Sequence, residues 1–496
     1  MPDEGTLDPN DWDEIQRVFQ RAIEGCLSHT RDVRERPVWQ PTPETIKARF
    51  REPLPSVGQP LEELLARFEE TVLPYGTGNV HPRFWGWVHG SGNVAGALGE
   101  MLAGFMNCNA GGRDHVATYV ERQVIDWSKE IFGFPATSSG ILTTGTSMAT
   151  LIALAVARDS RADAPVQKLG VAAASPLVAY ASAEAHRSVI KAFDLLGLGT
   201  DALRLVPVDG DCRLQVNRMA QKVTADRAHG YRPFAVIATA GSANTGAIDD
   251  LDRVTEFCRE NDLWLHVDGA FGGLAVLTPE FRPQLAAIAQ ADSVAFDFHK
   301  WLHVPYDAGC VLVRDASAHR SAFAARPSYL AGHAEGLAAG DPWYCDFGPE
   351  LSRGFRALKV WFSLKAYGVE RYGELISRNC AQARQLAAVI ESHAELELLA
   401  KVALNIVCFR FVTAGLSNET LDTLNTRIVT EIQLSGTAVT STARIGGKMA
   451  IRAAITNHRT TSDDLALLVA AVLQRGRAIA EDAAQSQASG ATRRAA

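Results

Sequence analysis

Short apolar runs alternate with longer amphipathic stretches from about residue 80 to residue 375. The apolar runs include GILTT, LVAYAS, FAVIATA, LWLHVDGA, DSVAFDF and GCVLVRD, and helical patterns such as SMATLIALAVAR and DLDRVTEFCREN lie between them. Continuous apolar runs are typical of strands buried on both faces, and their alternation with helices indicates a parallel sheet. We therefore expect an α/β fold with a mostly parallel central sheet.

The two ends of the chain have other patterns. Residues 1–80 hold two amphipathic helical stretches joined by a proline-rich connection, and their few apolar positions cannot form a core alone. LNIVCFRFV and MAIRAAIT indicate strands of a smaller domain that a helix follows. We expect a helical segment 1–80 lying on another domain or subunit, a large α/β domain 81–375, a small α+β domain 376–482 and a disordered tail 483–496.

Composition narrows the classes of function. The 496 residues carry a formal net charge of −7 and no lysine- or arginine-rich run, which argues against a nucleic-acid or membrane-surface role. Eight dispersed cysteines show no metal-site spacing, so no metal is expected. Because no long apolar stretch and no apolar signal core are present, we expect a soluble cytoplasmic protein.

Candidate chemistry lies just after the apolar runs. Ligands of open α/β sheets collect at the carboxyl ends of the strands. The residues at these places are Gly145-Thr146-Ser147, His186, Ser242, Asp268 and His299-Lys300. Gly145-Thr146-Ser147 offers backbone N–H groups, hydroxyls and the positive end of a helix, which suits a phosphate. A capped helix without a ligand is the alternative interpretation.

Asp268 ends an otherwise apolar run, where a carboxylate needs a cation or several donors. A protonated heteroaromatic nitrogen is one such partner, and a structural ion pair or helix cap is the alternative. His186 is either a surface residue at a helix start or a ring that stacks on a planar ligand.

Lys300 lies between Phe298, His299 and Trp301. Aromatic neighbours favour the neutral amine, which can condense with an aldehyde. A phosphate cup, a stacking histidine, a carboxylate for a ring nitrogen and a lysine together describe a pyridoxal-phosphate site.

The sequence resembles the group II pyridoxal-phosphate-dependent amino-acid decarboxylases, which include the aromatic-L-amino-acid and glutamate decarboxylases. The resemblance runs from about His81 to Ala453. Its motifs are HPRFWGWV, TGTSMATLIAL, AEAHRSV, ATAGSANTGAID, LWLHVDGAFGG, DFHKWL, RPSYL and SRGFRALKVWFSLKAYG. It implies a fold-type I homodimer that decarboxylates an L-amino acid, releasing the amine and carbon dioxide.

The resemblance also implies roles for single residues. Lys300 would form the aldimine with the cofactor, Asp268 would bind the pyridinium nitrogen and His186 would stack on the ring. The remaining cofactor contacts would come from Thr146, Ser147, Ser242, Ala270 and His299.

A loop of about 40 residues after GCVLVRD contains Tyr329, and loops of that length are often lids. By resemblance, Tyr329 reprotonates the quinonoid after carbon dioxide leaves. Related aldehyde synthases typically carry Phe there or lose the stacking histidine, so Tyr329 and His186 favour simple decarboxylation. An aldehyde synthase, a transaminase and a protein without cofactor remain the alternatives.

Some positions depart from the family. Asp297 replaces an asparagine that is usual in the animal aromatic enzymes, and the segment expected to reach across the dimer contains polar Asn109. Trp85, Trp87 and His89 lie in the stretch that would line the substrate pocket, although such aromatics are also typical of a core. We expect an aromatic substrate, with a polar or acidic amino acid as the alternative.

Overall fold

The computed structural model describes residues 5–324 and 332–495, with the backbone alone beyond residue 482. Its large sheet has the strand order β1-β7-β6-β5-β4-β2-β3. The strands are β1 (Ser139–Thr143), β2 (Leu177–Ser182), β3 (Leu203–Val206), β4 (Arg232–Thr239), β5 (Trp264–Asp268), β6 (Ser293–Asp297) and β7 (Gly309–Val313). Only β7 runs antiparallel to its neighbours. The expected α/β class with a mostly parallel sheet is confirmed.

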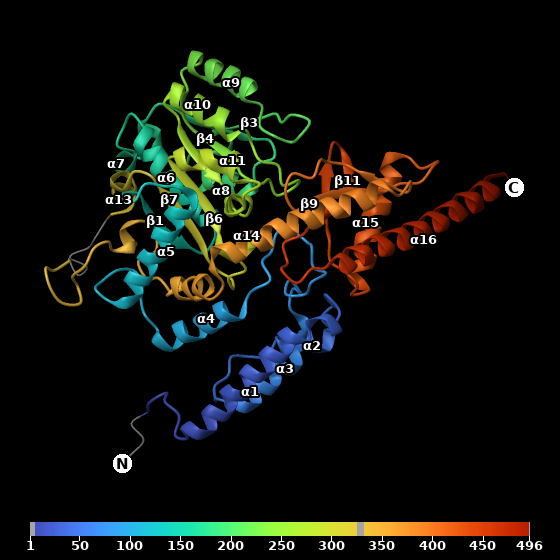
Figure 1. The fold of residues 1–496 in the computed structure, drawn as a ribbon, viewed down its shortest axis with the longest axis horizontal. Helices are drawn as coiled ribbons and strands as arrows, with labels where there is room; N and C mark the ends of the chain where they lie inside the picture. The colour runs from blue at the N-terminus through green and yellow to red at the C-terminus, as the bar shows by residue number, and fades with distance from the viewer. Residues whose placement is uncertain (1–4, 325–331, 496) are drawn as a thin grey trace.

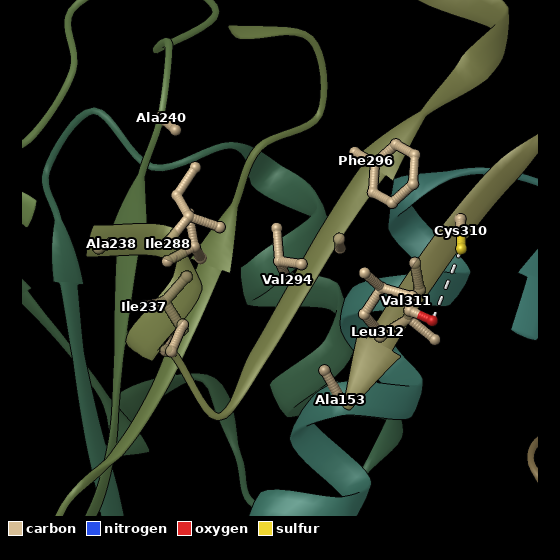
Figure 2. Packing of buried hydrophobic residues seen from close by; sticks show 14 of the residues in the cluster. Ala153, Ile237, Ala238, Ala240, Ile288, Val294, Phe296, Cys310, Val311 and Leu312 are labelled. Atoms are coloured by element: carbon tan, nitrogen blue, oxygen red, sulfur yellow. Dashed lines mark hydrogen bonds between the residues drawn. The ribbon is translucent and has the colours of Figure 1, made fainter. Parts of the chain in front are cut away.

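Helices cover both faces of this sheet (Figure 1). Those that pack against its strands include α5 (Val116–Phe132), α6 (Thr146–Arg161), α9 (Val216–Ala228), α10 (Leu251–Asn261), α12 (Phe298–Trp301) and α13 (Ala316–Phe323). The same domain also contains α4 (Val94–Met106), α7 (Val166–Leu169), α8 (Arg187–Leu195) and α11 (Arg282–Leu285). Figure 2 shows Val294 of β6 and Leu312 of β7 near Ala153 of α6, all fully buried. Small residues on α6 let the helix approach the sheet closely. The packed sheet fixes where each strand ends, and so positions the side chains that follow.

A smaller domain follows α14 (Arg356–Glu391), whose helical geometry breaks at Gly368 with φ +70°. Its antiparallel sheet has the order β10-β11-β9-β8, from β8 (Leu396–Leu398), β9 (Ile406–Phe411), β10 (Ser441–Ile445) and β11 (Lys448–Ala454). The helices α15 (Asn418–Leu434) and α16 (Ser462–Ala495) accompany it. The expected domain boundary at residue 375 therefore falls inside α14.

The backbone of α16 is helical from Ser462 to Ala495 and includes residues 483–495 of the expected tail. The disorder expected for that tail stays a prediction. Within the described residues, no helix is both long and apolar enough for a bilayer span.

The N-terminal helices lie beside each other and away from the large sheet (Figure 1). They are α1 (Trp12–Arg31), α2 (Glu44–Arg49) and α3 (Leu61–Thr71). Arg21 of α1 forms ion pairs with Glu62 and Glu69 of α3. Contacts of this segment with the rest of the chain include Val38, which packs with Phe84 and Val439, and Arg34, which forms an ion pair with Asp464.

Candidate active site

A cavity of about 570 Å³ lies at the carboxyl ends of the central strands. Three parts of the chain, which are far apart in sequence, line it. Trp87, Val88 and His89 come from the loop before α4, and Ser441, Thr442 and Arg452 come from the small domain. The region of the large sheet contributes Thr144, Gly145, Thr146, Ser147, His186, Ser188, Thr239, Gly241, Ala243, Asn244, Asp268, Ala270, Phe271, Asp297, His299, Lys300 and Tyr306. The cavity thus brings together most of the predicted site residues.

The start of α6 forms one side of the cavity. Thr146 and Ser147 are its first residues, where backbone N–H groups have no partner within the helix. The hydroxyl Oγ1 of Thr146 is buried and has no hydrogen-bond partner among the described residues. A buried hydroxyl of this kind calls for an acceptor from outside the chain. The positive end of α6 and this hydroxyl therefore fit an anionic oxygen such as that of a phosphate.

Asp268 ends β5 and is buried on the cavity floor. Burial raises the pKa of its carboxyl group above the ordinary value, while the positive charges of Lys300 and His186 act in the opposite direction. Within the described residues, its Oδ1 accepts a hydrogen bond only from the backbone N–H of Ala270, at 3.1 Å. A protonated ring nitrogen would supply the missing charge-assisted partner.

His186 caps the N-terminus of α8. Its Nδ1 accepts hydrogen bonds from the backbone N–H of Ser188 at 3.3 Å and from the Ser188 hydroxyl at 2.8 Å. Burial lowers the pKa of the imidazole, so the neutral ring is favoured, with its proton on Nε2. A neutral, fixed ring on the cavity wall is suited to stacking on a planar ligand.

Lys300 belongs to the short helix α12, directly after β6. Its Nζ lies 3.0 Å from Oδ2 of Asp297, and Nε2 of His299 lies 3.6 Å from the same oxygen. Nδ1 of His299 accepts a 3.1 Å hydrogen bond from the backbone N–H of Ala308. Burial lowers the pKa of His299, which leaves Lys300 as the cation nearest to Asp297.

Aromatic rings form the opposite wall. The rings of Trp87 and His89 are stacked with centroids 5.7 Å apart, and Tyr306 lies edge-on to His89 at 6.0 Å. Tyr306 also packs against His299, with 4.3 Å between centroids. Burial raises the pKa of the Tyr306 phenol to about 12, so the hydroxyl stays protonated at neutral pH. We did not predict Tyr306 from the sequence, although it follows Lys300 by only six residues.

Arg452 is a second site residue that we did not predict. It lies on β11 and is buried, and burial lowers the pKa of its guanidinium to about 10. It donates to the carbonyl oxygens of Trp87 at 2.9 Å and Asn244 at 3.1 Å, and to the Ser441 hydroxyl at 3.1 Å. Among the described residues, no carboxylate forms an ion pair with it, so its positive charge is available to the cavity. The sequence signal that could have identified Arg452 is its place within the otherwise apolar run MAIRAAIT.

Three predicted residues, Trp85, Ser242 and Asn109, do not line this cavity. Trp85 is fully buried in the core of the small domain and donates from Nε1 to the Thr460 hydroxyl, so the prediction that it contacts substrate needs correction. The positive φ of Trp87, +52°, breaks the alternation that would place 85, 87 and 89 on one side. The hydroxyl of Ser242 bonds to that of Thr245 within a tight turn instead of facing the cavity.

Asn109 also lies elsewhere in the single chain. Its Oδ1 accepts hydrogen bonds from the backbone N–H groups of Gly111 at 3.0 Å and Arg353 at 3.1 Å. Its contact with a substrate across a dimer stays a prediction. Tyr329 falls outside the described residues, and its role likewise stays a prediction.

The residues present fit pyridoxal phosphate. The cavity offers an orphaned hydroxyl at a helix start for a phosphate, a buried carboxylate for a ring nitrogen and a primary amine for an aldehyde. Ala270, with its small side chain, lines the floor between Asp268 and Phe271, where a planar ring needs room.

Comparison with known proteins agrees with this fit. The sequence model described as "Pyridoxal-dependent decarboxylase conserved domain" matches residues 43–412. An aromatic-L-amino-acid decarboxylase from Bacillus atrophaeus is 32% identical over 91% of this chain and 93% of its own. A histidine decarboxylase from Drosophila melanogaster is 31% identical over 92% of this chain and 54% of its own.

The fold is likewise shared. The crystal structure of Oryza sativa TDC with PLP and tryptamine matches 96% of this chain and 100% of its own, with a TM-score of 0.88 at 24% identity. The resemblance noted in the sequence is confirmed, as are the enzyme class and the cofactor. With its fold, its cavity and these matches taken together, the chain belongs to the family of pyridoxal-dependent decarboxylases.

Proposed function

We propose that this decarboxylase acts on an aromatic L-amino acid and releases the corresponding amine and carbon dioxide. The observation that carries the aromatic preference is the wall formed by Trp87, His89 and Tyr306. Aromatic rings at these distances attract another ring by edge and face contacts, each worth about 0.5–1.5 kcal/mol. The name of the relative from Bacillus atrophaeus supports the same substrate class.

Pyridoxal phosphate, when bound, supplies an aldehyde that condenses with amines and a ring that accepts the electron pair released with carbon dioxide. Thr146 and Ser147 hold its phosphate at the start of α6 in this proposal. Asp268 keeps the ring nitrogen protonated, and His186 covers one face of the ring. Lys300 would provide the amine that holds the cofactor through its aldehyde.

Arg452 orients the substrate through charge. Its guanidinium remains protonated at neutral pH, because even the lowered pKa is about 10. A substrate carboxylate entering the cavity would be attracted to this buried cation. The backbone carbonyls and the hydroxyl that it already binds fix its plane, so the attraction has a defined direction.

A proton must return to the substrate carbon after carbon dioxide leaves. We assign this step to the phenol of Tyr329, on the strength of the family resemblance, with His186 as the second candidate. Described residues supply a water-poor setting, since His299, Asp268 and Asp297 are all buried. Exclusion of water protects the carbanionic carbon from side reactions.

A polar or acidic amino acid is the second candidate substrate. Ser441, Thr442 and Asn244 line the cavity together with Arg452, and they could bind a polar side chain. The aromatic wall and these polar residues line parts of the cavity that differ in chemistry. Which substrate is preferred therefore depends on which part receives the side chain of the substrate.

The working assembly is proposed to be a homodimer. Apolar residues are exposed on three helices that lie at one end of the chain: Trp12, Phe19, Ile23 and Leu27 of α1; Leu61, Leu64 and Phe68 of α3; and Leu98, Phe105 and Met106 of α4. Exposed apolar surface of this extent usually marks an interface. Sedimentation equilibrium of the full chain checks this, and a monomer at micromolar concentration would contradict it.

A substrate panel tests the proposed reaction. The protein loaded with pyridoxal 5'-phosphate is incubated with single L-amino acids, and carbon dioxide and amine are measured together. We expect equal amounts of both from tryptophan, tyrosine or phenylalanine, and little from glutamate. Preferential turnover of glutamate or aspartate would support the second candidate, and aldehyde with ammonia would indicate an aldehyde synthase.

A further inference from the structure

Asp297 joins the phosphate side of the cavity to Lys300. Its Oδ1 accepts a 2.7 Å hydrogen bond from the backbone N–H of Thr146, the first residue of α6. Its Oδ2 lies 3.0 Å from Nζ of Lys300. One carboxylate therefore occupies an N–H group at the helix start and also pairs with the reactive amine.

Packing holds this carboxylate in place. Asp297 ends β6 and is paired with Gly309 of β7. A Cβ atom on Gly309 would lie 2.7 Å from Oδ1 of Asp297 and 2.5 Å from the Cα of Gly145. The two glycines thus make room for the carboxylate directly against the backbone that precedes α6. Asp297 is 2% exposed, so solvent screens its charge little.

The charges in this part of the cavity are unfavourable for a phosphate. Burial lowers the pKa values of His186 and His299, which favours their neutral forms. Lys300 is then the cation that faces Asp297 and Asp268. A phosphate monoester adds a charge of about −1.5 to −2 at neutral pH. At the start of α6 it meets an N–H group that already has a carboxylate partner.

We propose that Asp297 is a positioning residue that holds Nζ of Lys300 by their ion pair and competes with the cofactor phosphate for the N–H group of Thr146. This inference rests on the proposed placement of the phosphate at Thr146 and Ser147. An asparagine at 297 keeps an oxygen for the Thr146 N–H but removes the charge. The acid therefore weakens phosphate binding at this site and restrains the amine of Lys300.

Binding of pyridoxamine 5'-phosphate to the cofactor-free protein tests the competition, because this compound has no aldehyde and forms no bond to Lys300. We expect Asp297→Asn to bind it about tenfold more tightly than the wild type, since one buried like charge is removed. Inorganic phosphate should likewise bind more tightly to Asp297→Asn than to the wild type. Equal or weaker binding by Asp297→Asn would overturn the proposal.

Matched variants separate charge from folding. Asp292 lies just before β6, at the opposite end from Asp297, and accepts a 2.7 Å hydrogen bond from the backbone N–H of Leu265. Asp292→Asn makes the same chemical change away from the cavity and should bind pyridoxamine 5'-phosphate like the wild type. Asp297→Ser is a second neutral variant, useful if Asp297→Asn folds poorly, and it should also bind more tightly.

Acetylation of the cofactor-free protein, followed by peptide mass spectrometry, tests whether Asp297 restrains the amine of Lys300. Lys300 should react several-fold faster in Asp297→Asn than in the wild type, because its Nζ is no longer held in an ion pair with a carboxylate. Lys401, which is exposed and distant from the cavity, serves as the internal reference. An unchanged ratio of Lys300 to Lys401 acetylation would overturn the proposed hold of Asp297 on Lys300. Failure of the wild type to take up pyridoxal 5'-phosphate would instead contradict the proposed cofactor site itself.

Discussion

The guanidinium of Arg353 and the carboxylate of Glu121 form a buried two-point ion pair, with N–O distances of 2.7 and 2.9 Å. Arg353 also donates to the carbonyl oxygens of Ala110 and Leu142, and Glu121 accepts from the backbone N–H of Leu142. This pair therefore ties β1, which leads to the phosphate side of the cavity, to two distant segments.

Glu121→Gln should lower the free energy of unfolding by about 3 kcal/mol, because it leaves a buried guanidinium without its counter-charge. Urea unfolding at pH 7.5 measures this. Glu280→Gln, which breaks an exposed pair with Arg384, is the matched control and should cost less than about 1 kcal/mol. Equal effects of the two substitutions would contradict a special role for the buried pair.

His319 should make stability depend on pH. It is fully buried; its Nε2 donates to the carbonyl oxygen of Phe347, its Nδ1 accepts from the Ser139 hydroxyl, and burial lowers its pKa to about 4. The unfolded chain takes up this proton near the ordinary pKa of 6.5, so the stabilisation is full above pH 6.5 and is lost as the pH falls to about 4. The free energy of unfolding that is lost in this way amounts to roughly 3 kcal/mol.

Urea unfolding at pH 7.5, 6 and 5 checks this dependence. His319→Gln should be less stable at pH 7.5 but should lose less stability on acidification than the wild type. The same substitution at His229, an exposed residue, should leave the slope unchanged. A wild-type slope retained in His319→Gln would assign the acid sensitivity to other buried histidines.

The sequence predicted the strands of the large sheet well wherever they are continuous apolar runs, as in β2 and β5. It did not reveal β3, because LRLV is a short edge strand that carries Arg204 and of which only the first and last residues are buried. The predicted site residues that reach the cavity all follow strands of the large sheet or lie on the loop before it. Arg452 escaped prediction because the small domain brings it to the cavity, and only the tertiary arrangement shows that contact.

Asp297 and Trp85 illustrate the same limit. The sequence showed that an acid precedes Lys300, but its contact with Thr146 links positions 151 residues apart. Trp85 is of a residue type that often lines substrate pockets. The turn at Trp87, however, places the Trp85 side chain in the core of the small domain. Local patterns determine which residue types are present, and the packing of domains determines which of them meet.

Trp87→Ala tests the aromatic wall. We expect the KM for an aromatic L-amino acid to rise about fivefold, from the loss of roughly 1 kcal/mol of ring contact, with a smaller change in kcat. Trp361→Ala removes an indole from α14 outside the cavity and should leave KM unchanged. A KM for the aromatic substrate that does not change in Trp87→Ala would favour the polar part of the cavity as the side-chain site.

Tyr329→Phe tests the assigned proton donor. Without the phenol, amine output should fall by at least about a hundredfold, the usual contribution of a general acid, and aldehyde should appear. Tyr306→Phe is the control: it removes a phenol that lines the cavity but is not assigned to proton transfer, so amine should remain its product. Undiminished amine from Tyr329→Phe would remove Tyr329 from the reaction.

The central claim is that Lys300 carries the cofactor. Borohydride reduction of the protein loaded with pyridoxal 5'-phosphate, followed by proteolysis and mass spectrometry, locates the covalent bond directly. We expect one modified peptide, with the reduced cofactor on Lys300, and no such peptide from Lys300→Ala. A label on another lysine, or normal amine production by Lys300→Ala, would contradict it.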